Sequence, residues 1–320
     1  MKRRKLWRRV LIGVVVLLIL YLGIGGWLAS GLIHRILTVG AIAAQIEGAE
    51  APDSPYDLGY RGDPAAAFGY AFDDVVIDTP LGGAPAWFVP AQGGPSALWA
   101  IYVHGIAGHR EDGYRHLSVL HEAGIPTLLI TYRNDDGAPR SAEDMYTFGL
   151  AEWADLDAAV TYALANGAEN VVIAAESMGG GIAGQFLTRS AQTDRVAALI
   201  LDAPALDLPA TIAYGLRRTG VPLSLGIERI ALRLFSIRNP VDLNAALSLD
   251  AVASFPRPLF VAHGSGDRIV PVSLSDRLTA ERYGVTTYLR THADHLQSWQ
   301  EDPDLYRTQL FLFLSQLLPS

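Results

Sequence analysis

The sequence predicts an α/β fold, in which a mostly parallel central sheet is flanked by helices, preceded by an N-terminal transmembrane helix. Short apolar runs alternate with helix-like segments between residues 97 and 318, as expected for strands buried on both faces. Half of the 320 residues are apolar and 18% are charged, so the chain can bury a full core. A long uncharged stretch near the N-terminus predicts the membrane helix.

The predicted membrane helix follows a basic cluster. Six of the first nine residues are Lys or Arg, and the next twenty-one, Val10 to Ser30, carry no charge. At 1.5 Å per residue this stretch can cross a hydrocarbon layer of about 30 Å. The basic cluster should stay cytoplasmic, so residues from about His34 onward are expected outside the cytoplasm. A cleaved signal peptide, with Ala29-Ser30 as its cleavage site, is the alternative.

The remaining charge argues against a nucleic-acid partner. The net charge is −8, and removal of the six basic N-terminal residues leaves −14 for the rest, without a basic stripe. The chain has no cysteine, which excludes disulfides, thiolate metal sites and cysteine nucleophiles.

Three regions are expected along the chain. Residues 1–35 form the basic tail and anchor, residues 36–69 a juxtamembrane segment and linker, and residues 70–320 the globular domain. A helix over 36–46 and a proline-rich linker over 51–64 are expected within the second region.

The elements of the globular domain follow from its apolar pattern. An antiparallel hairpin is expected first, with strands at 75–77 and 86–89. Further strands are expected at 97–103, 126–131, 171–174, 196–201, 258–262 and 286–289. Helices are expected at 112–123, 141–165, after residue 177, at 272–282 and at 305–318. An insertion at about 207–255 interrupts the alternation, and it forms either a lid over an active site or an ordinary helical elaboration.

A lone serine lies between the strand at 171–174 and a glycine-rich helix. The segment Ala175-Glu176-Ser177-Met178-Gly179 has the layout of a nucleophile elbow, a sharp strand-to-helix turn that exposes a serine hydroxyl. Small neighbours are needed because the serine backbone is strained. Ala175 stands where glycine is usual, and a tight turn without chemistry is the alternative.

Two further residues complete a candidate catalytic triad. Asp267 follows the strand at 258–262, and His295 follows the last strand. The order Ser177, Asp267, His295 places all three past the carboxyl ends of parallel strands, at one edge of the sheet. His292 is an alternative base, and Asp202 an alternative acid. The histidine would take the serine proton, and the carboxylate would hold the imidazole in the required tautomer.

An acyl-transfer site also needs N–H donors for the oxyanion. The backbone of Met178, directly after the serine, and that of Ile106, in the loop after the strand at 97–103, are the candidates. His104 and Gly105 are expected to shape that loop, whereas His109, Arg110, Asp112 and residues 133–137 are expected to rim the site or to be solvated loop charges.

No cofactor or metal is predicted. The sequence has no G-x-G-x-x-G after the first parallel strand, no P-loop and no H-E-x-x-H helix.

These motifs together resemble the bacterial α/β-hydrolase family, particularly its membrane-anchored serine hydrolases. The resemblance covers about residues 72–318 and rests on four ordered motifs: His104-Gly105-Ile106-Ala107-Gly108, Ala175-Glu176-Ser177-Met178-Gly179-Gly180, His263-Gly264-Ser265-Gly266-Asp267-Arg268-Ile269-Val270-Pro271 and Asp294-His295-Leu296-Gln297-Ser298-Trp299. It implies an α/β-hydrolase fold, with Ser177 as nucleophile, Asp267 as acid, His295 as base, and Ile106 and Met178 as oxyanion donors.

The expected function is therefore that of a membrane-anchored serine hydrolase cleaving a small-molecule or lipid ester through an acyl-enzyme. A serine peptidase of the same fold and a catalytically silent binding module are the alternatives. The fold by itself does not choose a substrate.

Overall fold

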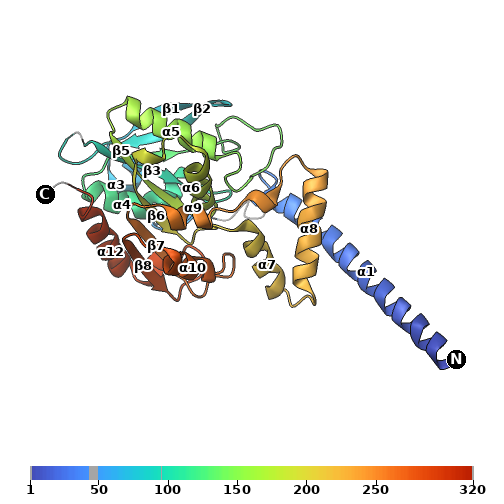
Figure 1. The fold of residues 1–320 in the computed structure, drawn as a ribbon. Helices are drawn as coiled ribbons and strands as arrows, with labels where there is room; N and C mark the ends of the chain where they lie inside the picture. Colours follow the sequence, from blue (N-terminus) through green and yellow to red (C-terminus); the bar gives the residue numbers. More distant parts are fainter. Residues whose placement is uncertain (1, 43–49, 95, 319–320) are drawn as a thin grey trace.

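The computed structural model describes residues 2–42, 50–94 and 96–318. An eight-stranded sheet forms its centre, in the order β1-β2-β4-β3-β5-β6-β7-β8 (Figure 1). β1 and β2 are antiparallel to their neighbours, and the other strands are parallel to one another. The strands are β1 (Asp73–Thr79), β2 (Gly82–Val89), β3 (Leu98–Val103), β4 (Thr127–Ile130), β5 (Asn170–Glu176), β6 (Val196–Asp202), β7 (Leu259–Gly264) and β8 (Thr286–Thr291). The predicted sheet and its hairpin are confirmed.

Helices cover both faces of the sheet. Alternate residues of a strand point to opposite faces, so Ile101 and Val103 belong to one apolar core while Ala100 and Tyr102 belong to the other. The first core includes residues of α5 (Trp153–Ala165), α6 (Met178–Arg189), α9 (Leu249–Ser254) and α10 (Ser273–Glu281). The second includes residues of α4 (Tyr114–Glu122), α11 (Ser298–Glu301) and α12 (Pro303–Ser315). A short helix, α3 (Pro64–Phe68), precedes the sheet.

The N-terminal helix α1 (Lys2–Leu37) projects from the body (Figure 1). It is long and apolar enough to cross a membrane. Residues 3–21 are exposed, whereas every third or fourth residue of its second half, from Leu22 to Leu37, faces the body and is buried or half-buried. The helix predicted over 36–46 is wrong beyond Leu37, where α1 ends. Thr38 forms an isolated antiparallel bridge with Met145, turns occupy residues 39–42, and residues 43–46 lie outside the described residues.

The second half of α1 packs against the insertion between β6 and β7. The insertion comprises α7 (Leu208–Arg218), α8 (Ser224–Arg238) and α9, and α8 lies beside α1 (Figure 1). Gly25 and Gly26 of α1 face Ile227 and Ile230 of α8.

The helix predicted over 141–165 is wrong in its first half, because only α5 is helical. Glu152 turns its carboxylate back to accept hydrogen bonds from the N–H groups of Thr147 and Gly149 at 2.6 and 2.9 Å, and from the Thr147 hydroxyl. Phe148 and Gly149 have φ values of 52° and 92°, which are incompatible with a right-handed helix. This loop receives the end of α1, since the Tyr146 N–H donates to Leu37 O at 2.9 Å.

The segment expected to be a linker, residues 51–64, packs on the body. Tyr56 stacks on Trp299 with ring centroids 5.2 Å apart, and Tyr114 donates its hydroxyl proton to Gly62 O at 2.6 Å.

Candidate active site

Ser177 occupies a strained turn between β5 and α6. Its backbone has φ 48° and ψ −116°, and the surrounding backbone holds it there. The Ser177 N–H donates to Asp202 O at 3.0 Å, and Ser177 O accepts from Gly180 N and Ala205 N at 3.0 and 2.8 Å. A non-glycine residue with positive φ at such a turn typically costs about 1–3 kcal/mol, which the surroundings must offset.

The small residues around Ser177 let neighbouring elements approach. A Cβ on Gly179 would lie 2.3 Å from Val103 O, so only glycine permits α6 to start this close to the end of β3. Ala175, at the position where glycine is usual, is fully buried in β5 and packs in the core. The methyl group is accommodated there.

His295 lies between Ser177 and Asp267. Its Nε2 is 3.0 Å from Ser177 Oγ, and its Nδ1 is 2.7 Å from Asp267 Oδ2. The structure therefore joins the three residues in one hydrogen-bonded chain, in which the imidazole bridges hydroxyl and carboxylate. Distances of this size permit proton transfer between serine and histidine.

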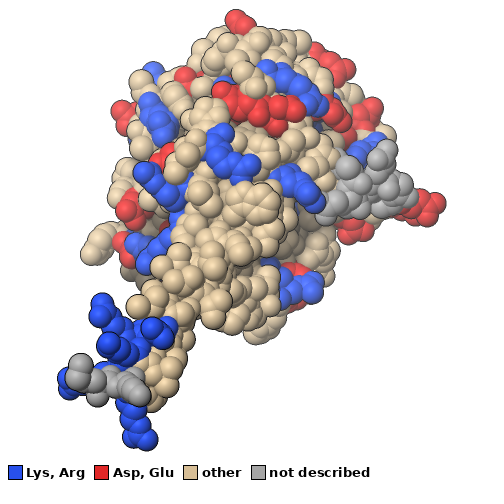
Figure 2. Space-filling model, turned by 90° about the vertical axis from the view of Figure 1, so that its right-hand side faces the viewer, with Lys and Arg blue, Asp and Glu red and all other residues tan. Residues whose placement is uncertain are grey.

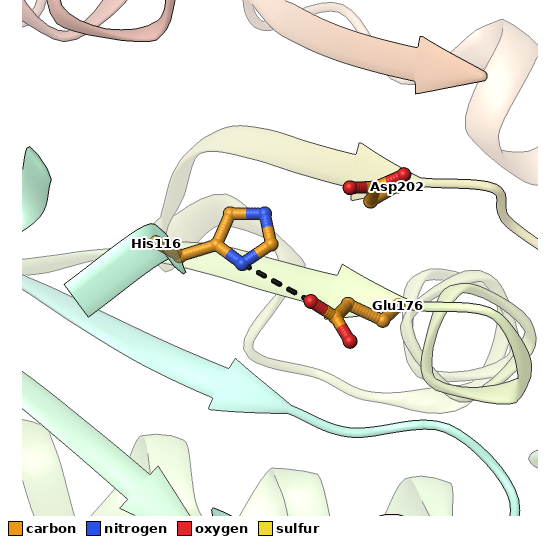
Figure 3. A group of neighbouring side chains, drawn as sticks. All are labelled: His116, Glu176 and Asp202. Carbon is orange, nitrogen blue, oxygen red and sulfur yellow. Dashed lines mark ion pairs between the residues drawn. The ribbon is translucent and has the colours of Figure 1, made fainter. Parts of the chain in front are cut away.

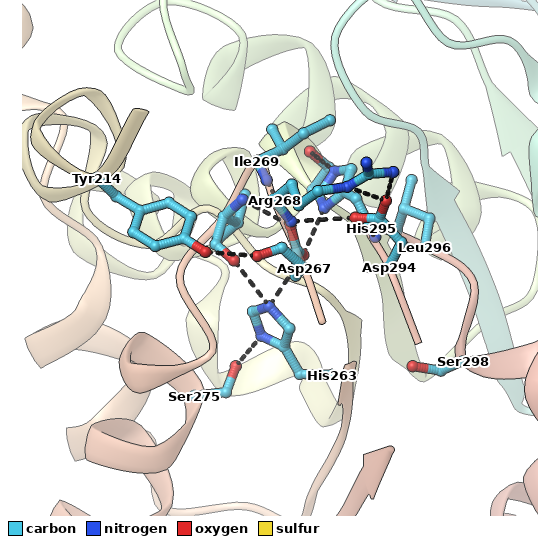
Figure 4. A network of polar contacts seen from close by, with 12 residues as sticks. Tyr214, His263, Asp267, Arg268, Ile269, Ser275, Asp294, His295, Leu296 and Ser298 are labelled. Carbon is cyan, nitrogen blue, oxygen red and sulfur yellow. Dashed lines mark hydrogen bonds and ion pairs between the residues drawn. The ribbon is translucent and has the colours of Figure 1, made fainter. Parts of the chain in front are cut away.

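Asp267 has additional partners. Its Oδ1 accepts from the N–H groups of Ile269 and Val270 at 2.7 and 2.8 Å, and its Oδ2 lies 3.1 Å from His263 Nε2 (Figure 4). Burial raises the pKa of Asp267, but hydrogen bonds from His263 and His295 outweigh this and hold the pKa well below its usual range. The carboxylate is therefore charged at neutral pH.

The two alternative triad residues lie elsewhere. His292 Nδ1 is 3.2 Å from Ser265 Oγ, and the His292 N–H donates to Glu301. Asp202 accepts a hydrogen bond from the Tyr306 hydroxyl at 3.0 Å. The structure thus brings His295 and Asp267, rather than His292 and Asp202, to the serine.

The loop after β3 borders Ser177. A Cβ on Gly105 would lie 3.1 Å from Ser177 Cβ, so the residue before Ile106 is in contact with the serine. Met178 is the first residue of α6, and N–H groups in the first turn of a helix have no partner within it. Gly105, directly before Ile106, therefore contacts the serine, and Met178 follows the serine along the chain.

His104 shapes this loop. Its Nδ1 is 2.8 Å from Gly105 O, and its Nε2 is 2.9 Å from Asp135 Oδ2. Burial lowers the pKa of His104, but the Asp135 carboxylate outweighs burial and raises it. His104 is fully buried, which suits a loop-shaping residue.

The charged residues expected at the rim have structural partners. Arg133 pairs with the buried Asp155 at 2.7 Å, Arg110 lies 3.9 Å from the centre of the Trp87 ring, and Asp112 accepts from the N–H of His109.

With the fold and this geometry established, comparison with known proteins identifies the family. The sequence profile of the alpha/beta hydrolase family matches residues 100–309. The chain belongs to the alpha/beta hydrolase family.

Two curated proteins are similar to this chain in sequence. Two uncharacterized proteins, from two strains of Mycobacterium tuberculosis, are 29% identical over 222 residues, which is 65% of this chain and 66% of each relative. The chain thus matches just under two thirds of the length of these curated relatives.

Solved structures show the same fold. The Pyrococcus furiosus esterase Pf2001 is 19% identical with a TM-score of 0.64, covering 85% of this chain and all of the esterase. Est1E from Butyrivibrio proteoclasticus, solved with ferulic acid, is 20% identical with a TM-score of 0.58, covering 76% of this chain and 98% of Est1E.

A buried charge cluster beneath Ser177 escaped the sequence analysis. Arg115 pairs with Glu176, the residue before the serine, and Arg115 Nη1 donates to Leu296 O, the residue after His295, at 2.8 Å. One guanidinium therefore joins the end of β5 to the loop that carries the His295 imidazole. Glu176, an acidic residue at the end of a buried apolar strand, was the one sequence feature that pointed to a buried partner of opposite charge.

Three members of this cluster offer atoms of the kind that bind metals. His116, Glu176 and Asp202 present ligand atoms within 4.8 Å of one another (Figure 3). The Arg115 guanidinium already neutralises Glu176, and with His116 it outweighs burial and lowers the pKa of Glu176. A cation here would have to displace a buried arginine, so the donor set does not fit a resident metal.

Proposed function

We propose that this hydrolase cleaves carboxylic esters through a serine acyl-enzyme, with Ser177 as nucleophile, His295 as base and Asp267 as the orienting acid. The observation that carries the proposal is the unbroken hydrogen-bonded chain from Ser177 Oγ through His295 to Asp267. A serine hydroxyl needs an adjacent base to attack a carbonyl at neutral pH, and this arrangement supplies one.

The reaction proceeds in two halves. Ser177 Oγ attacks the ester carbonyl carbon while His295 Nε2 takes its proton, and the N–H groups of Ile106 and Met178 stabilise the oxyanion. The carbon–oxygen bond to the alcohol breaks, and the alcohol leaves with the proton from His295. Water, deprotonated by His295, then attacks the acyl-enzyme. The bond from the acyl carbon to Ser177 Oγ breaks, Ser177 Oγ takes the proton back from His295, and the carboxylic acid leaves.

Strained backbone in three site loops supports this assignment. Ala107, Ser177 and Leu296 all have positive φ, at 52°, 48° and 57°. They lie in the proposed oxyanion loop, at the nucleophile and beside the base. Strained residues persist only where surrounding structure fixes them, and they cluster at active sites. The fold shared with a protein named as an esterase, Pf2001, is a second, weaker support.

We also propose that α1 is retained as a membrane anchor, with the catalytic domain outside the cytoplasm. Cleavage at Ala29-Ser30 would cut α1 within its packed half, where Gly26, Ala29, Ser30 and Ile33 are buried against the body. The basic cluster before Val10 favours a cytoplasmic N-terminus. An anchored site lies near lipids, so an acyl or lipid ester is the favoured substrate class.

An active-site-directed fluorophosphonate tests the nucleophile. We expect the wild-type chain and Ser265→Ala to be labelled, and Ser177→Ala not to be. His295→Ala should slow labelling strongly, whereas His292→Ala should not. Absence of wild-type labelling in a folded protein would overturn the proposal and favour a silent binding module. A parallel panel of p-nitrophenyl esters and peptide anilides separates esterase from peptidase activity.

A further inference from the structure

The α7–α8 pair runs beside the projecting helix α1. The Tyr21 hydroxyl donates to Pro222 O at 2.8 Å, and His34 Nδ1 lies 3.1 Å from Asn239 Oδ1. Residues early in α1 therefore meet the start of α8, and later residues meet its end, so the two helices run in the same direction. The turn between α7 and α8 consequently lies at the level of Tyr21, beyond the body.

Small residues allow the two helices to approach closely. A Cβ on Gly26 would lie 2.3 Å from Ile230 Cγ2, and one on Gly226 would lie 3.2 Å from Leu22 Cδ2. Glycines at such crossings are typical of helix pairs within membranes, where close packing replaces the hydrophobic effect.

The length of α1 places the turn between α7 and α8 inside the hydrocarbon region of the membrane. If the hydrocarbon region begins after Arg9, about 20 residues carry the chain across it, to near Ala29. Leu22, which faces Gly226, is seven residues earlier and thus roughly 10 Å deeper at 1.5 Å per residue. This depth matches that of segments lying in a membrane interface, about 5–10 Å.

The turn carries apolar side chains on its surface. Leu223 is 57% exposed, Leu225 is 50% exposed, and Val221 is also exposed. Its hydrogen bonding is partly internal: the N–H groups of Thr219 and Gly220 donate to Leu216 and Arg217, and those of Gly226 and Ile227 donate to Leu223 O. Figure 2 shows an uncharged surface continuous from the projecting helix onto the body, with basic side chains beside it.

The α7–α8 pair is basic, although the protein as a whole is acidic. Residues 208–238 contain five arginines and one glutamate, a formal charge of +4, whereas the chain carries −8. Its exposed arginines are Arg217, Arg218, Arg229, Arg233 and Arg238. Their long stems can cross apolar surface while the guanidinium groups reach the lipid phosphates.

We propose that the α7–α8 turn, residues 219–225, inserts into the membrane leaflet from which α1 emerges, while the flanking arginines bind lipid phosphates. The inference rests on the proposed anchor. It also bears on the substrate, because Tyr214 of α7 donates its hydroxyl proton to Asp267 O at 2.7 Å (Figure 4). The inserted α7–α8 pair therefore contacts the loop of the proposed acid, and this favours an acyl ester lipid of the same leaflet as the substrate.

Depth-dependent fluorescence quenching tests the insertion, and the absence of cysteine makes single labelling straightforward. The full chain carries one cysteine, as Leu223→Cys, Leu17→Cys or Val76→Cys, labelled with the fluorophore NBD. Each is reconstituted into phosphatidylcholine–phosphatidylglycerol vesicles with or without doxyl-labelled lipid. Val76 is a matched surface control, because it is 65% exposed and lies on β1.

Quenching at positions 17 and 223, without quenching at 76, is the expected result. Quenching at 17 alone would overturn the insertion and leave the anchor standing, and quenching at neither would overturn both. Fluorophosphonate labelling of the same samples reports on the proposed hydrolase separately. Arg217→Gln with Arg218→Gln should weaken quenching at 223, and unchanged quenching would overturn the phosphate contacts alone.

Discussion

At the scale of single residues, Asp267 is the most heavily bonded member of the proposed triad. Four hydrogen-bond donors surround its carboxylate: two backbone N–H groups and the imidazoles of His263 and His295. His263 in turn lies 2.7 Å from Ser275 Oγ, so the second imidazole is itself held in place. Asp267 is thereby fixed in position before any substrate binds.

Replacement of Asp267 by asparagine should therefore affect both activity and acid stability. The amide cannot stabilise the imidazolium, so ester hydrolysis should fall by about 10⁴-fold. The folded carboxyl has a pKa below its unfolded value of about 3.9, so its stabilisation is present above about pH 4 and is lost as the pH falls further. Urea unfolding of wild type and Asp267→Asn should show a difference in the free energy of unfolding near pH 5 that shrinks below about pH 4. A difference that grows in acid would contradict this assignment.

Arg115 connects two parts of the proposed active site, since it pairs with Glu176 and donates to Leu296 O. Its removal leaves the buried Glu176 carboxylate without its guanidinium partner and with only the His116 imidazole at 3.3 Å, so Arg115→Met should lower the free energy of unfolding by about 3–5 kcal/mol. Arg115→Met with Glu176→Gln removes both charges and should recover much of this loss. If the double variant is as unstable as the sum of the two single variants, the pair is not coupled.

A separate readout distinguishes positioning from stability in that double variant. Leu296 O loses its guanidinium donor there, so the loop carrying His295 is less constrained. We expect slower fluorophosphonate labelling than in wild type at a temperature where both are fully folded. Equal labelling rates would limit Arg115 to a purely structural role.

At the scale of elements, the strands were predictable and some connections were not. Buried parallel strands are short apolar runs, and each run that the sequence analysis expected to be a strand is a strand of the sheet. The helix over 141–152 failed because the Glu152 carboxylate and the end of α1 organise that segment as a loop. Tertiary contacts of this kind override local helical preference and leave no periodic signal.

In the candidate active site, too, the sequence indicated some contacts and gave no signal for others. The order of Ser177, Asp267 and His295 along the chain, combined with parallel strands, indicated that they would meet. The bond from Arg115 to Leu296 O joins residues 181 positions apart, and no sequence spacing indicates it. The pairing of α1 with α8 was equally hidden, although Gly25-Gly26 within an apolar helix hinted at a close helix contact.

The need for glycine at position 179 can be tested by comparison with Gly215, a glycine in open space. Gly179→Ala places a Cβ 2.3 Å from Val103 O and 2.8 Å from His104 O, so α6 must move away from the proposed oxyanion loop. We expect lower stability and a loss of hydrolysis. Gly215→Ala is the control, because a Cβ there meets nothing within 4 Å and alanine favours the interior of α7 by about 0.5–1 kcal/mol. Thermal unfolding and ester turnover of both variants should diverge, and equal behaviour would contradict the close approach.

At the scale of the whole molecule, α1 is part of the fold as well as a projecting segment. Its buried residues Ala29, Ile33 and Leu37 belong to the same apolar core as the sheet and α6. The insertion therefore contacts both α1, through α8, and the loop of Asp267, through Tyr214 of α7. A change in the packing of α1 should therefore alter the reactivity of the proposed active site.

Gly26 and Gly23 provide the contrast needed to test this coupling. Gly26→Leu forces α1 away from Ile230, and overpacking of this kind costs about 1–3 kcal/mol. At roughly 2–4 °C per kcal/mol, the unfolding temperature in detergent should fall by about 2–12 °C. Gly23→Leu adds the same side chain where a Cβ meets nothing within 4 Å, so its unfolding temperature should match wild type. Because Tyr214 links the insertion to Asp267, Gly26→Leu should also slow fluorophosphonate labelling, whereas Gly23→Leu should not. Equal shifts in the two variants would mean that α1 acts only as a tether.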